Sequence, residues 1–198
     1  MREIVSGVWR WTWFSEEKGM NFNGYLARLG KELVLIDPAY AEEPLWAEME
    51  RYGKPSAILL TNKDHERASE ELKRRFKAKV YVHEQEAPLL SSKPEATFKD
   101  GATLFGELKA IRFTKFKSPA ECAFHWPKRK VLFVGDAVTG HPAGKVGLVK
   151  KHLDKPEVLE DLKQLLDLEF DALLVGDGEP FLARGKAALE AFLGAGKK

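Results

Sequence analysis

Short apolar runs that end in polar or acidic residues recur along this chain. Residues 57–60 lead into Thr61, residues 131–134 lead into Gly135-Asp136, and residues 172–175 lead into Gly176-Asp177. Apolar runs of this length are typical of buried strands. In folds that combine strands and helices, ligands bind at the carboxyl ends of strands. The pattern therefore predicts that ionisable side chains gather at strand ends.

Periodicity predicts the remaining elements. Ala68, Leu72 and Phe76 are spaced four apart, which indicates a helix with one buried face. Alternating tryptophans at 9, 11 and 13 indicate an opening strand with an aromatic face that packs in the core. We expect strands at 4–13, 22–29, 33–36, 55–60, 79–82, 96–98, 103–105, 108–113, 121–126, 130–134 and 172–175. We expect helices at 44–52, 66–76, 156–166 and 185–193.

The order of these elements indicates the fold class. Two blocks of strands, each flanked by helices, favour an α+β fold, a four-layer αββα sandwich. A doubly wound parallel sheet is disfavoured, because both blocks contain successive strands without a helix between them. No linker rich in Pro, Gly or Ser divides the chain, so residues 1–198 are expected to form a single domain.

Composition narrows the class of function. Hydrophobic residues make up 44% and charged residues 31% of 198 residues, as in soluble globular proteins. The 32 basic and 30 acidic residues argue against a nucleic-acid surface. We see no signal peptide or membrane segment, so we expect a cytoplasmic protein that binds a small molecule. Cys122 is expected to be a packed thiol, and the charged composition is compatible with a thermophilic source. Oligomeric state is left open.

Six segments carry a family resemblance: residues 21–38, 59–66, 83–86, 115–120, 133–136 and 175–178. Their order and acidic strand ends resemble the metallo-β-lactamase superfamily, and its glyoxalase-II-like hydrolases in particular. In that family the second segment carries an HxHxDH metal motif. Two registers of this motif stay open. One matches Asp64-His65 to the family's Asp-His, and the other matches Asn62 and Asp64 to its leading histidines and Glu66-Arg67 to Asp-His. We prefer the first register.

The chain departs from the family at three histidines. Asn62, Lys117 and Asp177 stand in their places. The first metal site of the family is therefore expected to be lost, with the Lys117 ammonium near the missing cation. The resemblance implies that a second site remains and has the ligand set Asp64, His65, Asp136 and Asp177. Three carboxylates and one imidazole suit one divalent ion, Mn²⁺, Fe²⁺ or Zn²⁺. The alternative is a metal-free network in which Lys117 and Arg67 balance the acids.

Two functions remain open. In a metal-dependent hydrolase, Asp64 or Asp136 would orient or deprotonate water, and Lys117 would stabilise the developing oxyanion. The alternative is a non-catalytic family member that binds a ligand or partner as a scaffold. Residues expected to support the site are Asp37, Asn62, Arg67 and His141. Asn62 or Asp64 is also expected to cap the following helix, and His83 is expected in a surface loop.

Overall fold

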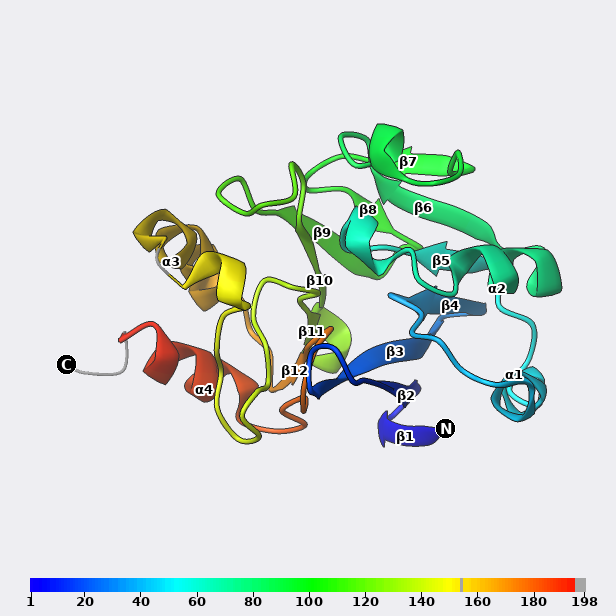
Figure 1. Ribbon diagram of the computed structural model, residues 1–198, viewed down its shortest axis with the longest axis horizontal. Coiled ribbons are helices and arrows are strands. Elements are labelled where there is room, and N and C mark those ends of the chain that lie inside the picture. Colours follow the sequence, from blue (N-terminus) through cyan, green and yellow to red (C-terminus); the bar gives the residue numbers. More distant parts are fainter. Residues whose placement is uncertain (154, 195–198) are drawn as a thin grey trace. The chain divides into compact units, whose positions relative to one another are not determined.

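The computed structural model describes residues 1–153 and 155–194 and divides into two compact units, Met1–Lys99 and Asp100–Lys198. Each contains one mixed sheet with helices (Figure 1). In the first unit, seven strands run in the order β1 to β7. Their bounds are β1 Arg2–Val5, β2 Val8–Ser15, β3 Met20–Leu29, β4 Glu32–Ile36, β5 Ala57–Leu59, β6 Lys79–His83 and β7 Ala96–Phe98.

The first sheet changes from antiparallel to parallel at β4. Strands β1 to β4 form antiparallel neighbours, whereas β4 to β7 pair in parallel. Parallel neighbours need a crossover, and the crossovers carry helices α1 (Glu43–Glu50) and α2 (Ser69–Phe76). The 3₁₀ turns η1 (Lys63–His65) and η2 (Ala87–Leu89) follow β5 and β6. The carboxyl ends of β4, β5 and β6 therefore share one edge of this sheet.

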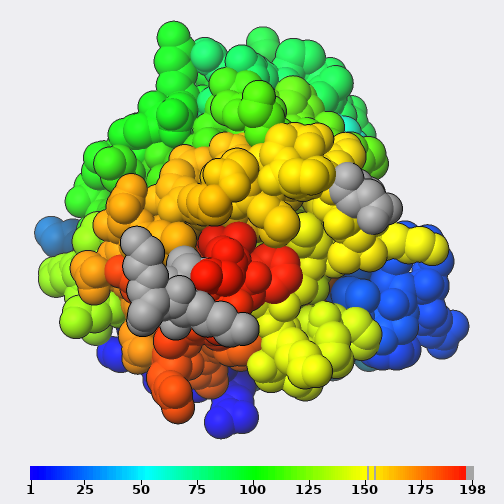
Figure 2. All heavy atoms as spheres, turned by 90° about the vertical axis from the view of Figure 1, so that its left-hand side faces the viewer, coloured from blue at the N-terminus to red at the C-terminus, as the bar shows by residue number. Residues whose placement is uncertain are grey.

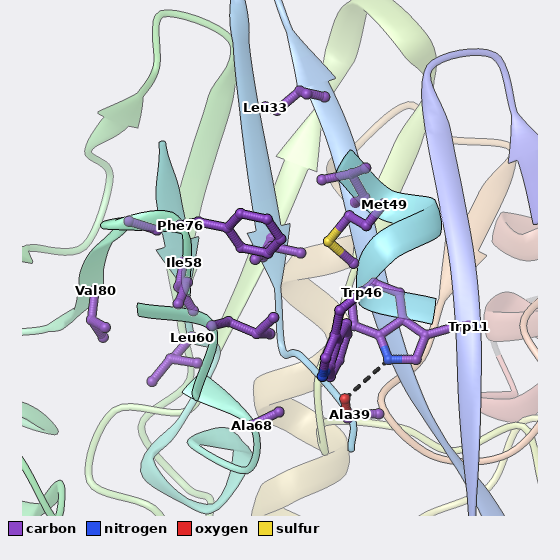
Figure 3. Packing of buried hydrophobic residues seen from close by; sticks show 14 of the residues in the cluster. Trp11, Leu33, Ala39, Trp46, Met49, Ile58, Leu60, Ala68, Phe76 and Val80 are labelled. Carbon is purple, nitrogen blue, oxygen red and sulfur yellow. Dashed lines mark hydrogen bonds between the residues drawn. The ribbon is translucent and has the colours of Figure 1, made fainter. Parts of the chain in front are cut away.

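Tryptophans from the sheet and a helix form the centre of this unit's core (Figure 3). Trp11 of β2 packs edge-on against Trp46 of α1, with ring centroids 5.9 Å apart. Its indole Nε1 donates to the carbonyl oxygen of Ala39 at 3.0 Å. Trp9 is also buried, so the expected core role is confirmed for two tryptophans, whereas the Trp13 side chain is 40% exposed.

The second unit holds a five-stranded sheet in the order β12-β11-β10-β9-β8. The bounds are β8 Thr103–Leu104, β9 Leu108–Arg112, β10 Cys122–Trp126, β11 Val131–Phe133 and β12 Ala172–Leu174. Only β11 and β12 pair in parallel among these strands. The helices are α3 (Pro156–Leu162) and α4 (Gly185–Phe192), with 3₁₀ turns η3 (Pro127–Arg129), η4 (Lys150–His152) and η5 (Lys163–Asp167). Figure 2 faces this helical layer, with α4 in red.

Three expectations about single elements were wrong. The strand expected at 4–13 is a hairpin of β1 and β2, because Gly7 turns the chain with φ +78°. The helix expected from residue 66 begins at Ser69, because η1 and the positive φ of Arg67 (+31°) precede it. The helix expected at 156–166 changes to 3₁₀ geometry after Leu162. In the part of the chain that the structure describes, no helix is long and apolar enough to span a membrane.

Candidate metal centre

A buried carboxylate organises the end of β4 in the first unit. Asp37 follows β4, and its Oδ1 accepts from the backbone N–H of Thr61 at 2.8 Å. Its Oδ2 accepts from the Thr61 hydroxyl at 2.7 Å and lies 2.8 Å from Nδ1 of His65. All three side chains are at most 3% exposed. We call Asp37, Thr61 and His65 the histidine cluster.

One ring nitrogen of His65 lies inside the histidine cluster. Nδ1 is 2.8 Å from the Asp37 carboxylate and 3.1 Å from the Thr61 hydroxyl. A carboxylate behind an imidazole raises its basicity and restricts its rotation. Asp37 holds this position with φ +47°, which Asp and Asn tolerate better than other side chains. Asp37 therefore connects Thr61 to the His65 ring, and its role as a supporting residue of a site stays a prediction.

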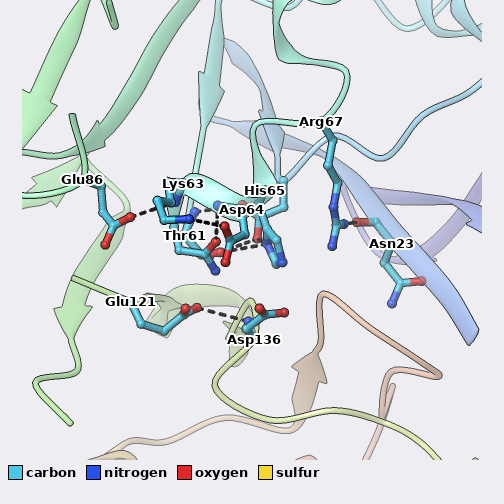
Figure 4. A network of polar contacts seen from close by, with 11 residues as sticks. Asn23, Thr61, Lys63, Asp64, His65, Arg67, Glu86, Glu121 and Asp136 are labelled. Atoms are coloured by element: carbon cyan, nitrogen blue, oxygen red, sulfur yellow. Dashed lines mark hydrogen bonds and ion pairs between the residues drawn. The ribbon is translucent and has the colours of Figure 1, made fainter. Parts of the chain in front are cut away.

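The turn that presents His65 is held by side chains on both sides (Figure 4). Asn62 caps η1, because its side-chain oxygen accepts from the backbone N–H of Asp64 at 2.8 Å. The expectation that Asn62 or Asp64 caps the following helix was wrong, since the N-cap residue of α2 is Ala68. Glu86, which is fully buried, accepts from the backbone N–H of Lys63 at 2.9 Å. Asp64 itself is exposed and forms an ion pair with the Lys63 ammonium.

Arg67 and His83 are two further polar residues of this unit that the sequence singled out. Arg67 places its guanidinium 4.3 Å from the ring centroid of Phe22 and donates to the backbone oxygen of Asn23 at 3.5 Å. It precedes α2 and is half-buried. His83 is 2% exposed at the end of β6 and packs edge-on against Phe98, so the expectation of a surface loop was wrong.

In the second unit, Asp136 and Asp177 follow neighbouring parallel strands. Phe133 of β11 pairs with Leu174 of β12, and each aspartate lies three residues beyond this pair. The two side chains are 6% and 8% exposed, and one carboxylate oxygen of each lies within 4.8 Å of the other. We call them the carboxylate pair. Two buried carboxylates this close repel unless a cation or a proton separates their charges.

Backbone contacts hold the loops that carry the carboxylate pair. The N–H of Gly176 donates to Gly135, the N–H of Gly140 to Asp177, and the N–H of Glu179 back to Gly140. A Cβ at Gly140 would lie 1.8 Å from the Glu179 carbonyl oxygen, and a Cβ at Gly178 would lie 2.6 Å from the Gly140 carbonyl carbon. Glycines are required here because the two loops touch through their main chains.

The remaining predicted residues of this unit lie in loops. Glu121, which is 2% exposed, accepts from the backbone N–H of Asp136 at 3.1 Å, a contact that the sequence did not predict. The apolar residues around Glu121 were the available signal, since an isolated acid in a buried run needs a partner. Lys117 is exposed in the loop between β9 and β10, and His141 is exposed next to Gly140. The catalytic and supporting roles of these two stay predictions.

His65, Asp136 and Asp177 are three buried residues that offer donors for a metal ion. One imidazole and two carboxylates are a donor set that Fe²⁺, Mn²⁺ and Zn²⁺ accept in proteins. These residues therefore fit a metal ion by their chemistry. They include three of the four ligands that the resemblance implied. Metal binding by any of the four, Asp64 included, remains a prediction.

Comparisons with known proteins agree with this description. The family model of the Metallo-beta-lactamase superfamily matches residues 5–195. The structure of TTHA1623 in a di-iron-bound form is 28% identical, with a TM-score of 0.68, over 91% of this chain and 96% of that chain. A metallo-beta-lactamase from Pontibacter korlensis is 18% identical, with a TM-score of 0.72, over 98% of this chain and 96% of that one.

A metallo-beta-lactamase family protein from Thermus thermophilus, TTHA1429, is 19% identical with a TM-score of 0.71, over 98% of this chain and 80% of that chain. No curated protein matches the sequence. These matches confirm the predicted α+β sandwich class, since they extend over both mixed sheets. The chain belongs to the metallo-beta-lactamase superfamily.

Proposed function

We propose that this protein is a metal-dependent hydrolase of a small-molecule substrate and binds one divalent ion through His65, Asp136 and Asp177. The observation that carries the proposal is the carboxylate pair, in which a buried carboxylate oxygen of Asp136 lies within 4.8 Å of one of Asp177. A divalent cation is one of the species that would relieve the repulsion between these charges, and the Asp37 carboxylate against Nδ1 of His65 supports the proposal because it would orient an imidazole ligand. The description of TTHA1623 as di-iron-bound makes iron the first metal to test.

The residues of this chain have separate parts in that proposal. A bound divalent ion lowers the pKa of water and polarises the bond to be hydrolysed. Asp37 orients His65, and Asp136 or Asp64 orients the attacking water and accepts its proton. As a ligand, Asp64 would have to leave its ion pair with Lys63. Lys117 stabilises negative charge that develops on the substrate, while Arg67 and His141 act as supporting residues.

The proposal includes the domain organisation and the location. A single functional domain over residues 1–198 is supported by one family profile that extends across both compact units. The site of action that we propose is the cytoplasm, on the strength of composition alone. We propose one ion rather than two because Asn62 and Lys117 stand in place of histidines of the family's first metal site. The Asn62 side-chain oxygen caps η1, which is consistent with this replacement.

Elemental analysis of the purified protein tests the proposal. We expect about one equivalent of Fe, Mn or Zn per chain, either on purification or after incubation with each ion. Asp136→Asn and Asp177→Asn should each reduce bound metal to a small fraction of this value. Asp100→Asn is the matched control, since Asp100 is an exposed aspartate that accepts the backbone N–H of Arg112 and serves neither cluster. A panel of esters, thioesters and phosphodiesters then tests for turnover that these variants abolish.

Two results would contradict the hydrolase. If the protein binds no metal after incubation, the proposed metal-dependent hydrolysis is excluded. Metal binding without turnover of any compound class would favour the scaffold instead, which we keep as the second function because Asn62 stands in the place of a family histidine and its side-chain oxygen caps η1.

A further inference from the structure

Three loops of the second unit share one edge of its sheet with the carboxylate pair. Strand β10 runs antiparallel to β11, so residues 113–120, which precede β10, lie at the edge where β11 ends. Residues 134–153 and 175–184 follow β11 and β12 directly. The opposite edge holds the turn of η3, between β10 and β11.

Basic residues dominate two of these loops. Residues 113–120 contain Lys115 and Lys117 and no acidic residue. Residues 134–153 contain Lys145, Lys150 and Lys151, and their one acidic residue is Asp136 of the carboxylate pair. The whole chain has 32 basic and 30 acidic residues, so this separation of charge is local. The side chains of Lys115, Lys145 and Lys150 are exposed. The third loop adds one exposed acid, Glu179, two residues after Asp177.

The basic loops are anchored to the unit. Asp161 of α3 accepts the backbone N–H groups of Thr114 and Lys115 at 2.5 and 2.8 Å, so this carboxylate is committed to the main chain. Phe116 packs edge-on against His152 with centroids 4.8 Å apart, which joins the two loops. Thr139 and Gly147 exchange backbone hydrogen bonds at 2.8 and 3.0 Å. Lys115, Lys145 and Lys150 therefore lie on backbone segments that are held in place.

We propose that the basic loops, defined as residues 113–120 and 137–153, recognise an anionic substrate through a phosphate or carboxylate group. Lys115, Lys145 and Lys150 supply the attraction. An anion would be repelled by Asp136 and Asp177 alone, and positive charge on the adjoining loops offsets this repulsion and raises the rate of encounter. The inference rests on the proposed function, because it assumes that the bound anion is part of a substrate that is hydrolysed. Anion binding itself can be measured without turnover.

The test measures binding of inorganic phosphate and of succinate by calorimetry, on chelated and on metal-loaded full-length protein. Lys145→Gln/Lys150→Gln should weaken binding about tenfold in both forms, as expected for the loss of two partly screened charges. Lys128→Gln is the matched control, since Lys128 is an exposed lysine of η3 at the opposite edge, and should change binding less than about twofold. Lys117 is left intact because it belongs to the proposed catalytic group.

Each outcome decides the proposal. A loss restricted to phosphate or to succinate identifies which anion the loops recognise. An equal loss in Lys128→Gln, or wild-type protein that binds neither anion, would overturn it. Because the lysine effect is expected on chelated protein, a chain that binds anions but no metal would contradict the hydrolase while leaving this inference standing.

Discussion

The two clusters of candidate ligands are held by different means. In the first unit, side chains orient His65: Asp37 bonds to its ring and to both donors of Thr61. In the second unit, main-chain contacts position the carboxylate pair, through hydrogen bonds between the loops of Asp136 and Asp177 and the close approach at Gly140. The histidine cluster depends on the buried charge of Asp37, whereas the carboxylate pair depends on glycines that have no Cβ at the contact between its loops.

This difference separates what substitutions should do. Removing a charge from the histidine cluster changes the basicity and orientation of His65. It should change the stability of the first unit less, because that unit is also held by the core around Trp11 and Trp46. Adding a methyl group between the loops of the second unit displaces backbone, which the surrounding structure accommodates poorly. We therefore expect added atoms between the loops to act mainly on stability, and removal of the Asp37 charge to act mainly on metal affinity.

Gly140→Ala should have the largest effect. Its Cβ would overlap the Glu179 carbonyl, so the two loops must separate and lose their mutual hydrogen bonds. We expect a loss of about 3 kcal/mol or more in the free energy of unfolding, measured by urea denaturation. Gly106→Ala is the control, because a Cβ there meets nothing within 4 Å, and its φ of +71° should cost only about 1–2 kcal/mol. A smaller loss in Gly140→Ala than in Gly106→Ala would contradict the loop contact.

Asp37→Asn should have the next largest effect, and on metal binding. Asn keeps the shape and the positive φ but removes the negative charge behind His65. Loss of such a partner typically weakens metal binding by about 10–100-fold. Competition with a chromogenic chelator measures this affinity. Thr61→Ser, which keeps the hydroxyl, should stay within about threefold of wild type, and an unchanged affinity in Asp37→Asn would show that the carboxylate does not tune His65.

Sequence patterns were sufficient wherever a local period decides the structure. Strands β11 and β12, with their acidic ends, lie where the apolar runs predicted them, because four buried residues in a row have few other solutions. The spacing of Leu72 and Phe76 gave α2. Its first turn was misplaced, because the capping bond of Asn62 closes a separate 3₁₀ turn and Arg67 then takes a positive φ.

Contacts between distant segments were not predictable from those patterns. Glu86 bonds to a backbone group 23 residues earlier, and Glu121 to one 15 residues later. Thr61 connects Asp37 to the turn of His65 over 24 residues of sequence. In each case a polar side chain satisfies a group that the fold buries. Periodicity shows that such a residue is unusual where it stands, but the partner is set by strand order and register.

The smallest expected effect compares one ion pair from each unit. Burial alone raises the pKa of Glu95, but hydrogen bonds from Lys73 and from the backbone N–H of Val80 outweigh it and hold the pKa below the ordinary 4.5. In the second unit, the Lys186 ammonium lowers the pKa of Glu169 by a side-chain hydrogen bond without a backbone partner. Glu95 therefore has an additional bond that Glu169 lacks.

A carboxyl group whose pKa is lowered on folding stabilises the protein above its unfolded pKa and loses that contribution as pH falls through the folded value. We expect Glu95→Gln to cost about 0.5–1 kcal/mol at pH 7, a screened value for an exposed pair, and the difference from wild type to shrink below pH 4.5. Lys73, whose hydrogen bond with Glu95 raises its pKa, should lose its share only as pH rises above 10.5. Urea denaturation of Glu95→Gln and Glu169→Gln between pH 3 and pH 7 checks that the loss of stability is larger in Glu95→Gln. If Glu169→Gln lowers the free energy of unfolding as much as Glu95→Gln does, the hydrogen bond from the backbone N–H of Val80 to Glu95 adds no stability. The two ion pairs would then contribute equally.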